Sequence, residues 1–241
     1  MRLDKMLAHA GYGTRKEVKK LIKSGAISVQ GQVVSDPGYN VDPAQDLVTY
    51  LDDPIHYQKY YYVMLHKPAG LVSAKHDNVY ETVVEWVDLD YHHVDLFPVG
   101  RLDVDTTGLL LLTNHGQLAH QLLAPKHEVV KCYQAWVDGL VTEDDIDRFQ
   151  EGLDLGDFVS LPAELRIIEV DSQQEATFIE VDVMEGKFHQ VKRMFDAIDK
   201  PVLALKRLSM GPLWLDETLA EGDYRELTAA EMDLLRPYGL E

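Results

Sequence analysis

A short polar loop carries a concentrated set of reactive side chains. Residues 100–108 read Gly-Arg-Leu-Asp-Val-Asp-Thr-Thr-Gly, and four leucines follow at 109–112. An apolar run this short, bounded by turn residues, predicts a strand that is buried on both faces. Asp103 and Asp105 therefore lie at the mouth of a hydrophobic core, where a carboxylate is costly unless it is paired or hydrogen-bonded. Such a carboxylate can act as a nucleophile or a base, or it can simply cap the loop.

Spacing does not decide which of the two aspartates has the larger role. Residues two apart on an extended chain point the same way, so Asp103 and Asp105 are equivalent by position. A structural aspartate that caps the loop is also the commoner case. The loop alone therefore leaves the structural and the catalytic interpretations open.

A second reactive stretch is Glu-Gly-Lys-Phe-His-Gln-Val-Lys-Arg-Met-Phe at 185–195. Helical spacing predicts a core face made of Phe188, Val191, Phe195 and Ile198. Lys192 borders that face, and lysine is rarely buried unless it is paired. It can instead lay its stem on the core and send its ammonium group to water, which is the commoner arrangement. The helical wheel therefore permits, but does not require, an ion pair for Lys192.

The same stretch places His189 and Arg193 four residues apart on the side away from the core. The two side chains could hold a phosphate, or they could be solvated, and spacing favours neither. Because no partner ligands accompany the histidine, we expect no metal site. The chain also lacks a glycine-rich nucleotide loop.

Three motifs together resemble those of the pseudouridine synthases, in the branch that modifies bacterial ribosomal RNA. They are Gly-Arg-Leu-Asp-x-x-Thr-x-Gly-Leu-Leu-Leu-Leu-Thr-Asn, a Lys-x-Tyr context, and Gly-x-x-His-Gln-Val-Lys-Arg-Met. The resemblance implies that Asp103 is the essential catalytic residue and that Asp105 occupies a variable position. It also implies that Tyr133 stacks on the uracil ring near the proton lost from C5. Lys192 would pair with Asp103 and keep it ionised.

The resemblance implies further contacts with the substrate, and these predicted substrate-binding residues are Arg101, Lys67, His189, Gln190 and Arg193. The turn after Lys67, in Lys-Pro-Ala-Gly, predicts that its side chain is exposed and able to contact RNA. Arg101 would hold a phosphate or support the loop. The reaction moves the glycosidic bond of a uridine from N1 to C5, so we expect no cofactor.

The N-terminal residues form a basic region in an acidic chain. The 241 residues carry a formal charge of −18, but residues 1–35 contain seven Lys or Arg and two acids, a local balance of +5. Thr14-Arg-Lys-Glu17 is a capping box, and it predicts a helix with lysines opposite its apolar face. Lysines on a helix face are usually only solvated, but their density here favours phosphate contact. The predicted RNA-binding residues are Arg2, Arg15, Lys16, Lys19, Lys20 and Lys23.

The order of a helix, a basic helix and a hairpin resembles an S4 domain. We therefore predict an α+β chain with an S4-like RNA-binding domain and linker at 1–58. A catalytic domain at 59–241 would have a mixed, mostly antiparallel β-sheet flanked by helices, the pseudouridine synthase fold.

The single cysteine, Cys132, excludes an intrachain disulfide. No apolar run approaches the roughly 20 residues that span a bilayer, and we expect a cytoplasmic monomer.

The opening Met-Arg-Leu-Asp-Lys and the length of the chain favour the small-subunit branch of this family, which points to one uridine in 16S rRNA. We expect the partner to be ribosomal RNA or a small-subunit assembly intermediate. Large-subunit relatives, which act on 23S rRNA, share all three motifs and remain an alternative. A non-catalytic S4-type RNA-binding protein or ribosome-assembly factor is a further alternative, which would not need Asp103, Tyr133 and Lys192.

Overall fold

The leucine run forms the buried strand that the sequence predicts. In the computed structural model, which describes residues 1–240, β7 (Thr107–Thr113) contains Leu109–Leu112, and all four leucines are fully buried. The strand pairs antiparallel with β5 (Tyr62–Lys67) and parallel with β11 (Val202–Met210). Because neighbours flank it on both edges, β7 fixes where the preceding polar loop ends.

The chain divides into two compact units. The first comprises Met1–Tyr61 with Val87–Leu96, and the second comprises Tyr62–Trp86 with the residues from Phe97 onward. Among residues 1–240, no helix combines the length and the hydropathy needed to cross a bilayer.

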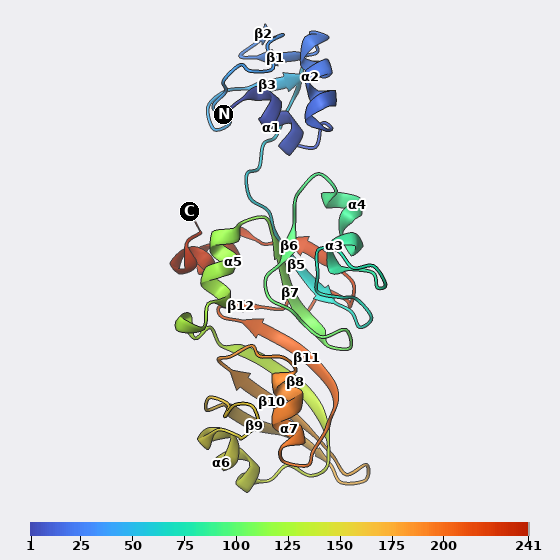
Figure 1. Ribbon diagram of the computed structural model, residues 1–241, viewed down its shortest axis with the longest axis vertical. Coiled ribbons are helices and arrows are strands. Elements are labelled where there is room, and N and C mark those ends of the chain that lie inside the picture. The colour runs from blue at the N-terminus through green and yellow to red at the C-terminus, as the bar shows by residue number, and fades with distance from the viewer. Residues whose placement is uncertain (241) are drawn as a thin grey trace. The chain divides into compact units, whose positions relative to one another are not determined.

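The first unit has the predicted order of a helix, a basic helix and a hairpin. Its elements are α1 (Leu3–His9), α2 (Arg15–Lys23), β1 (Ile27–Val29), β2 (Gln32–Val33), β3 (Val48–Tyr50), β4 (Asp53–Pro54) and α4 (Asp88–Tyr91). The strands form one sheet in the order β2-β1-β3-β4 (Figure 1). The predicted capping box is present, since Thr14 and Glu17 bond reciprocally at the start of α2. The buried faces of α1 and α2 share one hydrophobic core with the strands.

The second unit contains a nine-stranded sheet with the path β13-β5-β7-β11-β8-β10-β9, while β6 pairs with β7 and β12 pairs with β11 (Figure 1). Every strand pair in it is antiparallel except β7 with β11, which confirms the predicted mixed, mostly antiparallel sheet. The remaining strands are β6 (Phe97–Pro98), β8 (Lys131–Asp138), β9 (Glu164–Asp171), β10 (Ala176–Val183), β12 (Leu213–Trp214) and β13 (Tyr224–Glu226).

Helices flank this sheet. They are α3 (Val83–Trp86), α5 (Gly116–Leu123), α6 (Glu143–Glu151), α7 (Gln190–Asp196) and α8 (Ala229–Leu235), with short 3-10 turns η1 (Pro125–His127) and η2 (Arg236–Tyr238). Helix α7 contacts β11, and in the view of Figure 1 it lies in front of the sheet. Phe149 of α6 and Phe195 of α7 pack ring against ring with centroids 4.9 Å apart, which joins these two helices in one core.

The predicted core face at 188–198 was wrong at one position. Helix α7 begins at Gln190, so Phe188 lies outside it and is 72% exposed, whereas Val191, Phe195 and Ile198 are buried as predicted. Helix α5 begins after His115, which makes no side-chain capping bond. Its Nδ1 instead lies 2.9 Å from the hydroxyl of Tyr62.

Gly108 allows the parallel contact between β7 and β11. Its φ is +106°, and an added Cβ would lie 2.2 Å from the carbonyl oxygen of Arg207 and 2.6 Å from its nitrogen. Both atoms are backbone of the neighbouring strand, so no side-chain rotation can make room. Only glycine therefore fits where the polar loop at 100–108 enters the sheet.

We expect Gly108→Ala to lower the free energy of unfolding by at least about 2 kcal/mol, because it adds strain and a backbone clash. Gly116→Ala is the matched control, since nothing lies within 4 Å of its added Cβ and its φ is ordinary. That control should change the free energy by no more than about 0.5 kcal/mol. Urea denaturation measures both, and equal stabilities of the two variants would contradict this account of β7 and β11.

Candidate active site

A pocket of about 70 Å³ lies beside the loop that carries Asp103. Side chains from three parts of the second unit line it: Arg101, Leu102, Asp103 and Thr106 of the loop, Tyr133, Val183 and Leu205 of three strands, and Glu185–Lys187 with His189–Lys192. The sequence motifs at 100–108, 131–133 and 185–195 therefore meet around one cavity.

The ammonium group of Lys192 lies between the two loop carboxylates. Its Nζ is 3.1 Å from Oδ2 of Asp103 and 2.6 Å from Oδ1 of Asp105. The predicted Lys192–Asp103 ion pair is thus present, and Asp105 joins it. Residues 103–106 form a turn in which the Thr106 N–H donates to the Asp103 carbonyl, and this turn brings both carboxylates to the same ammonium group. The Asp105 side chain is 74% exposed and that of Asp103 only 27%. Asp103 is therefore the carboxylate that faces the pocket.

The electrostatics of this group follow from its geometry. The hydrogen bond from Lys192, aided by the attraction of its charge, holds the pKa of Asp105 below its usual value. Desolvation pulls the pKa of Lys192 down, but its bonds to Asp105 and Asp103 outweigh that effect and raise it. Lys192 therefore stays charged at neutral pH and supplies a fixed cation beside Asp103.

His189 contacts the same aspartate from another side. Its Nε2 lies 3.5 Å from Oδ1 of Asp103. Its backbone is left-handed, with φ of +50°, so the chain turns sharply just before α7. The predicted arrangement of His189 beside Arg193 on one helix face is wrong, because this turn takes His189 out of the helix.

Lys67 is fully buried, which corrects the prediction that it is exposed and contacts RNA. Its Nζ donates to the carbonyl oxygens of Pro68, Val104 and Thr106 at 2.9, 3.2 and 2.9 Å. Two of these carbonyls belong to the Asp103 loop. Burial lowers the pKa of Lys67 to about 8, although the nearby carboxylates of Asp105 and Asp103 oppose the shift. Lys67 therefore shapes the loop from within.

Ser73 holds the same loop from the other side, and no sequence pattern indicated it. Its hydroxyl donates to the carbonyl of Leu102 at 2.9 Å and accepts from the Leu102 N–H at 3.0 Å. The N–H of Gly70 donates to the carbonyl of Val104 at 2.7 Å. Segment 67–73 thus fixes the backbone on both sides of Asp103.

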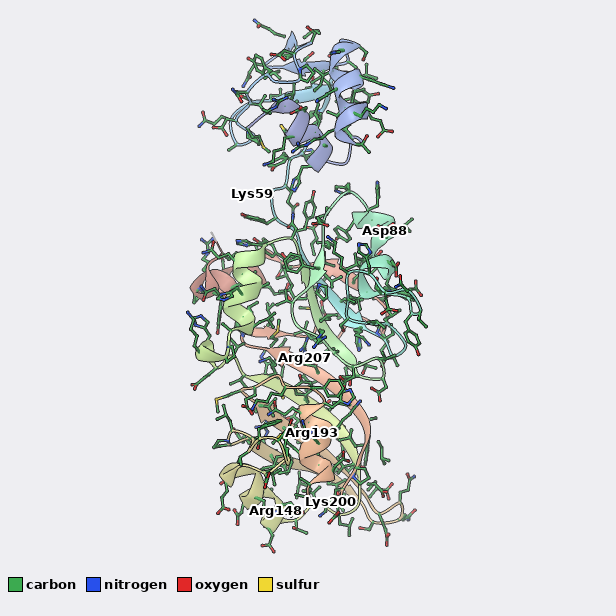
Figure 2. All side chains as sticks on the ribbon, in the orientation of Figure 1. Lys59, Asp88, Arg148, Arg193, Lys200 and Arg207 are labelled. Atoms are coloured by element: carbon green, nitrogen blue, oxygen red, sulfur yellow. The ribbon has the colours of Figure 1, made fainter. Side chains whose placement is uncertain are left out.

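Two other predicted substrate-binding residues, Gln190 and Arg193, bond to groups of the protein. Gln190 is buried, and its amide bonds Glu185 at 2.9 Å and the N–H of Lys187 at 3.1 Å. Arg193, labelled on α7 in Figure 2, donates to the carbonyl of Leu155 at 2.6 Å and pairs with Asp157. Arg193 does not line the pocket, since these partners draw it toward the 155–158 loop.

Tyr133 and Arg101 both reach the pocket. Tyr133 is buried on β8, between Val181 of β10 and Arg207 of β11. Arg101 is exposed and makes no hydrogen bond or ion pair within residues 1–240. Thr106, which no prediction singled out, is buried at the pocket, and its hydroxyl has no hydrogen-bond partner among these residues. The guanidinium group of Arg101 is therefore available to a ligand at the pocket.

The predicted RNA-binding residues of the first unit lie where a polyanion can reach them. Exposed side chains of α2 are Arg15, Lys16, Lys19, Lys20 and Lys23, while Val18 and Ile22 are buried on the opposite face. Arg2 differs, because its guanidinium bonds both oxygens of the buried Asp4 at 3.0 and 2.8 Å. The lysine face is therefore free of the core, whereas Arg2 already neutralises a carboxylate.

Comparison with known proteins assigns the family. Residues 61–197 match the RNA pseudouridylate synthase model, and residues 1–48 match the S4 domain model. A crystal structure of a pseudouridylate synthase aligns over 98% of this chain and 99% of its own, with 34% identity and a TM-score of 0.66. The chain therefore belongs to the RNA pseudouridylate synthase family, a family of isomerases, and carries an N-terminal S4 domain.

Several relatives cover almost the whole chain. An uncharacterized RNA pseudouridine synthase of Bacillus subtilis, YtzG, is 44% identical over 98% of both chains. Ribosomal small subunit pseudouridine synthase A of Vibrio parahaemolyticus is 39% identical over 97% of this chain and 98% of its own. Ribosomal large subunit pseudouridine synthase B of Bacillus subtilis is 36% identical over 98% and 95%. The resemblance found in the sequence motifs is thus confirmed at the level of the family.

We expect Lys192→Met to lower the isomerisation rate by about 100-fold, since two carboxylates would lose their shared cation. Lys192→Arg should stay within about tenfold of wild type because the charge remains. Single-turnover rates on RNA measure both effects. Thermal unfolding should hardly change, because a partly exposed ion pair contributes little to stability. A Lys192→Met enzyme with the wild-type rate would contradict this role.

A second prediction concerns Lys67. Above a pH of about 8 its amine loses one N–H and can no longer satisfy three carbonyls, so the loop should loosen and the rate should fall. Lys67→Gln should be slow at every pH. Lys126→Gln, an exposed lysine, is the control and should retain the wild-type profile. A wild-type rate that stays flat from about pH 7 to about pH 9.5 would contradict the prediction.

Proposed function

We propose that this chain converts one specific uridine of ribosomal RNA into pseudouridine, and that the uridine lies in small-subunit rRNA. Family membership and the S4 domain support an RNA substrate. The small-subunit relative and the opening Met-Arg-Leu-Asp-Lys favour 16S rRNA. A relative named for the large subunit has similar identity, so 23S rRNA is the alternative that the experiment must test.

Asp103 is the carboxylate that we propose for the reaction. The observation that carries this assignment is its ion pair with Lys192 at the pocket, 3.1 Å long. A carboxylate placed beside a fixed cation at the pocket can attack the nucleotide or remove a proton to start glycal formation, and the proposal includes both routes. Asp105 shares the cation but faces solvent, so its role is to help position Lys192.

Tyr133 is proposed to stack on the uracil ring, with its hydroxyl near the proton lost from C5. Its burial on β8 beside the pocket supports this. Arg101 is proposed to hold a phosphate of the flipped nucleotide, because it is exposed at the pocket and has no protein partner within residues 1–240. A base must leave its stack to reach such a site.

We further propose a division of labour along the chain. Residues 1–58 would hold the RNA through the α2 lysines, and residues 59–241 would carry out the chemistry as a monomer. The reaction conserves the atoms of the uridine and involves no redox change, so the proposal invokes no cofactor.

The experiment is carbodiimide mapping of 16S and 23S rRNA from cells with and without this chain. We expect one stop, in 16S rRNA, to vanish on deletion and to return with the wild-type gene. Asp103→Asn should not restore it, and its purified form should lose all measurable turnover because the loop keeps its shape but lacks the carboxylate.

Asp105→Asn is the matched control, with the same change two residues away, and should keep turnover within about tenfold of wild type. Turnover of Asp103→Asn within tenfold of wild type would overturn the catalytic assignment. A stop that disappears from 23S rRNA would replace the small-subunit proposal with the alternative. No change in either rRNA would favour a non-catalytic RNA-binding protein.

A further inference from the structure

Phe188 is an aromatic side chain exposed beside the candidate active site. It lies between Lys187 and His189, both of which line the pocket, and 72% of it is accessible to solvent. An aromatic ring is among the side chains that gain most from burial, so exposure at the edge of a substrate pocket favours a contact that forms on binding. Phe188 has no part in the proposed reaction of Asp103 and Tyr133.

The ring is held on one face only. It stacks on the imidazole of His189 with centroids 3.7 Å apart and an angle of 18° between the planes. Because most of the side chain is accessible, the opposite face remains open. The ring is thus a platform with a defined orientation and one free face.

The platform is tied to the reacting centre through His189. That residue has a left-handed backbone, and its Nε2 lies 3.5 Å from Oδ1 of Asp103. Non-glycine residues adopt this conformation rarely, and such strain is found where a site requires a particular geometry. The free face of Phe188 is therefore presented at a fixed place relative to Asp103.

The exposed ring of Phe188 can replace a stacking contact that RNA loses when a uridine flips out. When a base leaves its stack, the neighbouring base loses a stacking partner, which is part of the cost of flipping. Aromatic side chains stack on bases of any sequence, since every base has a π-face. We propose that the free face of Phe188 stacks on the nucleobase adjacent to the uridine that enters the pocket and replaces the stacking lost by that neighbour. This inference rests on the proposed function.

The main alternative to base stacking is a purely structural role for Phe188. In that case Phe188 would only shield His189, and its removal would alter the rate through Asp103 without changing RNA binding. A second alternative is that Phe188 contacts another protein. Measurements of RNA affinity and of the contacted nucleotide separate both from base stacking.

The first test measures binding without turnover, in the Asp103→Asn background. The probes are unmodified transcripts of 16S and 23S rRNA, and the Kd for each is measured by filter binding. Phe188→Ala should weaken binding to the substrate transcript by about tenfold, whereas Phe188→Trp should not. Trp214→Ala is the matched control, because Trp214 is 58% exposed but does not line this pocket, and its Kd should be unchanged.

The second test identifies the contacted base. Phe188→p-benzoylphenylalanine in the same background is irradiated with each transcript, and the cross-link is mapped by primer extension. We expect it at the nucleotide immediately beside the uridine whose carbodiimide stop vanishes on deletion. A cross-link elsewhere, no cross-link, or an unchanged Kd for Phe188→Ala would overturn the proposal. If no uridine is converted at all, the proposed function fails, but the affinity and the cross-link to an unpaired base still test stacking.

Discussion

The candidate site depends on one ammonium group shared by two carboxylates. Lys192 comes from the first turns of α7, and Asp103 and Asp105 come from a loop almost ninety positions earlier in the chain. Partners stabilise the partly buried ammonium group of Lys192, and a cation between two like charges on one loop relieves their repulsion. The same contact therefore neutralises the charge of Lys192 on the helix and of the two aspartates on the loop, and it holds the Asp103 carboxylate at the pocket.

That contact works only because the loop is held independently. Lys67 and Ser73 donate to its backbone carbonyls, and Gly108 lets it enter the sheet against the backbone of Arg207. These bonds order the main chain, so that only the side chain of Asp103 remains to be placed by Lys192. A catalytic group gains from such preorganisation because its geometry is set before the substrate arrives.

Much of this could be predicted from local patterns. The leucine run predicted β7, the capping box predicted α2, and the helical wheel placed Lys192 at the edge of the core. Each of these patterns depends only on residues that are close together in the sequence, so the sequence alone is enough to recognise it. The family resemblance added the choice of Asp103 over Asp105, which spacing could not make.

The failures have physical causes as well. The helical wheel assumed that the helix already included Phe188. The left-handed backbone of His189 instead delays the start of the helix, and the side chain of Phe188 is exposed. Lys67 was expected at the surface because it precedes a turn, yet carbonyls 37 and 39 positions away enclose it. Ser73 carried no signal, since its partner Leu102 is distant in sequence. Long-range backbone contacts of this kind cannot be read from periodicity.

Lys192 acts on the proposed reaction through Asp103 and not through Asp105. A double-mutant cycle in single-turnover isomerisation tests it most directly, with Lys192→Met made in the wild type and in Asp105→Asn. If Asp103 is the partner that matters, Lys192→Met should still slow the Asp105→Asn enzyme by at least about tenfold. If the loss disappears in that background, Lys192 serves only Asp105, and the account of the site is wrong.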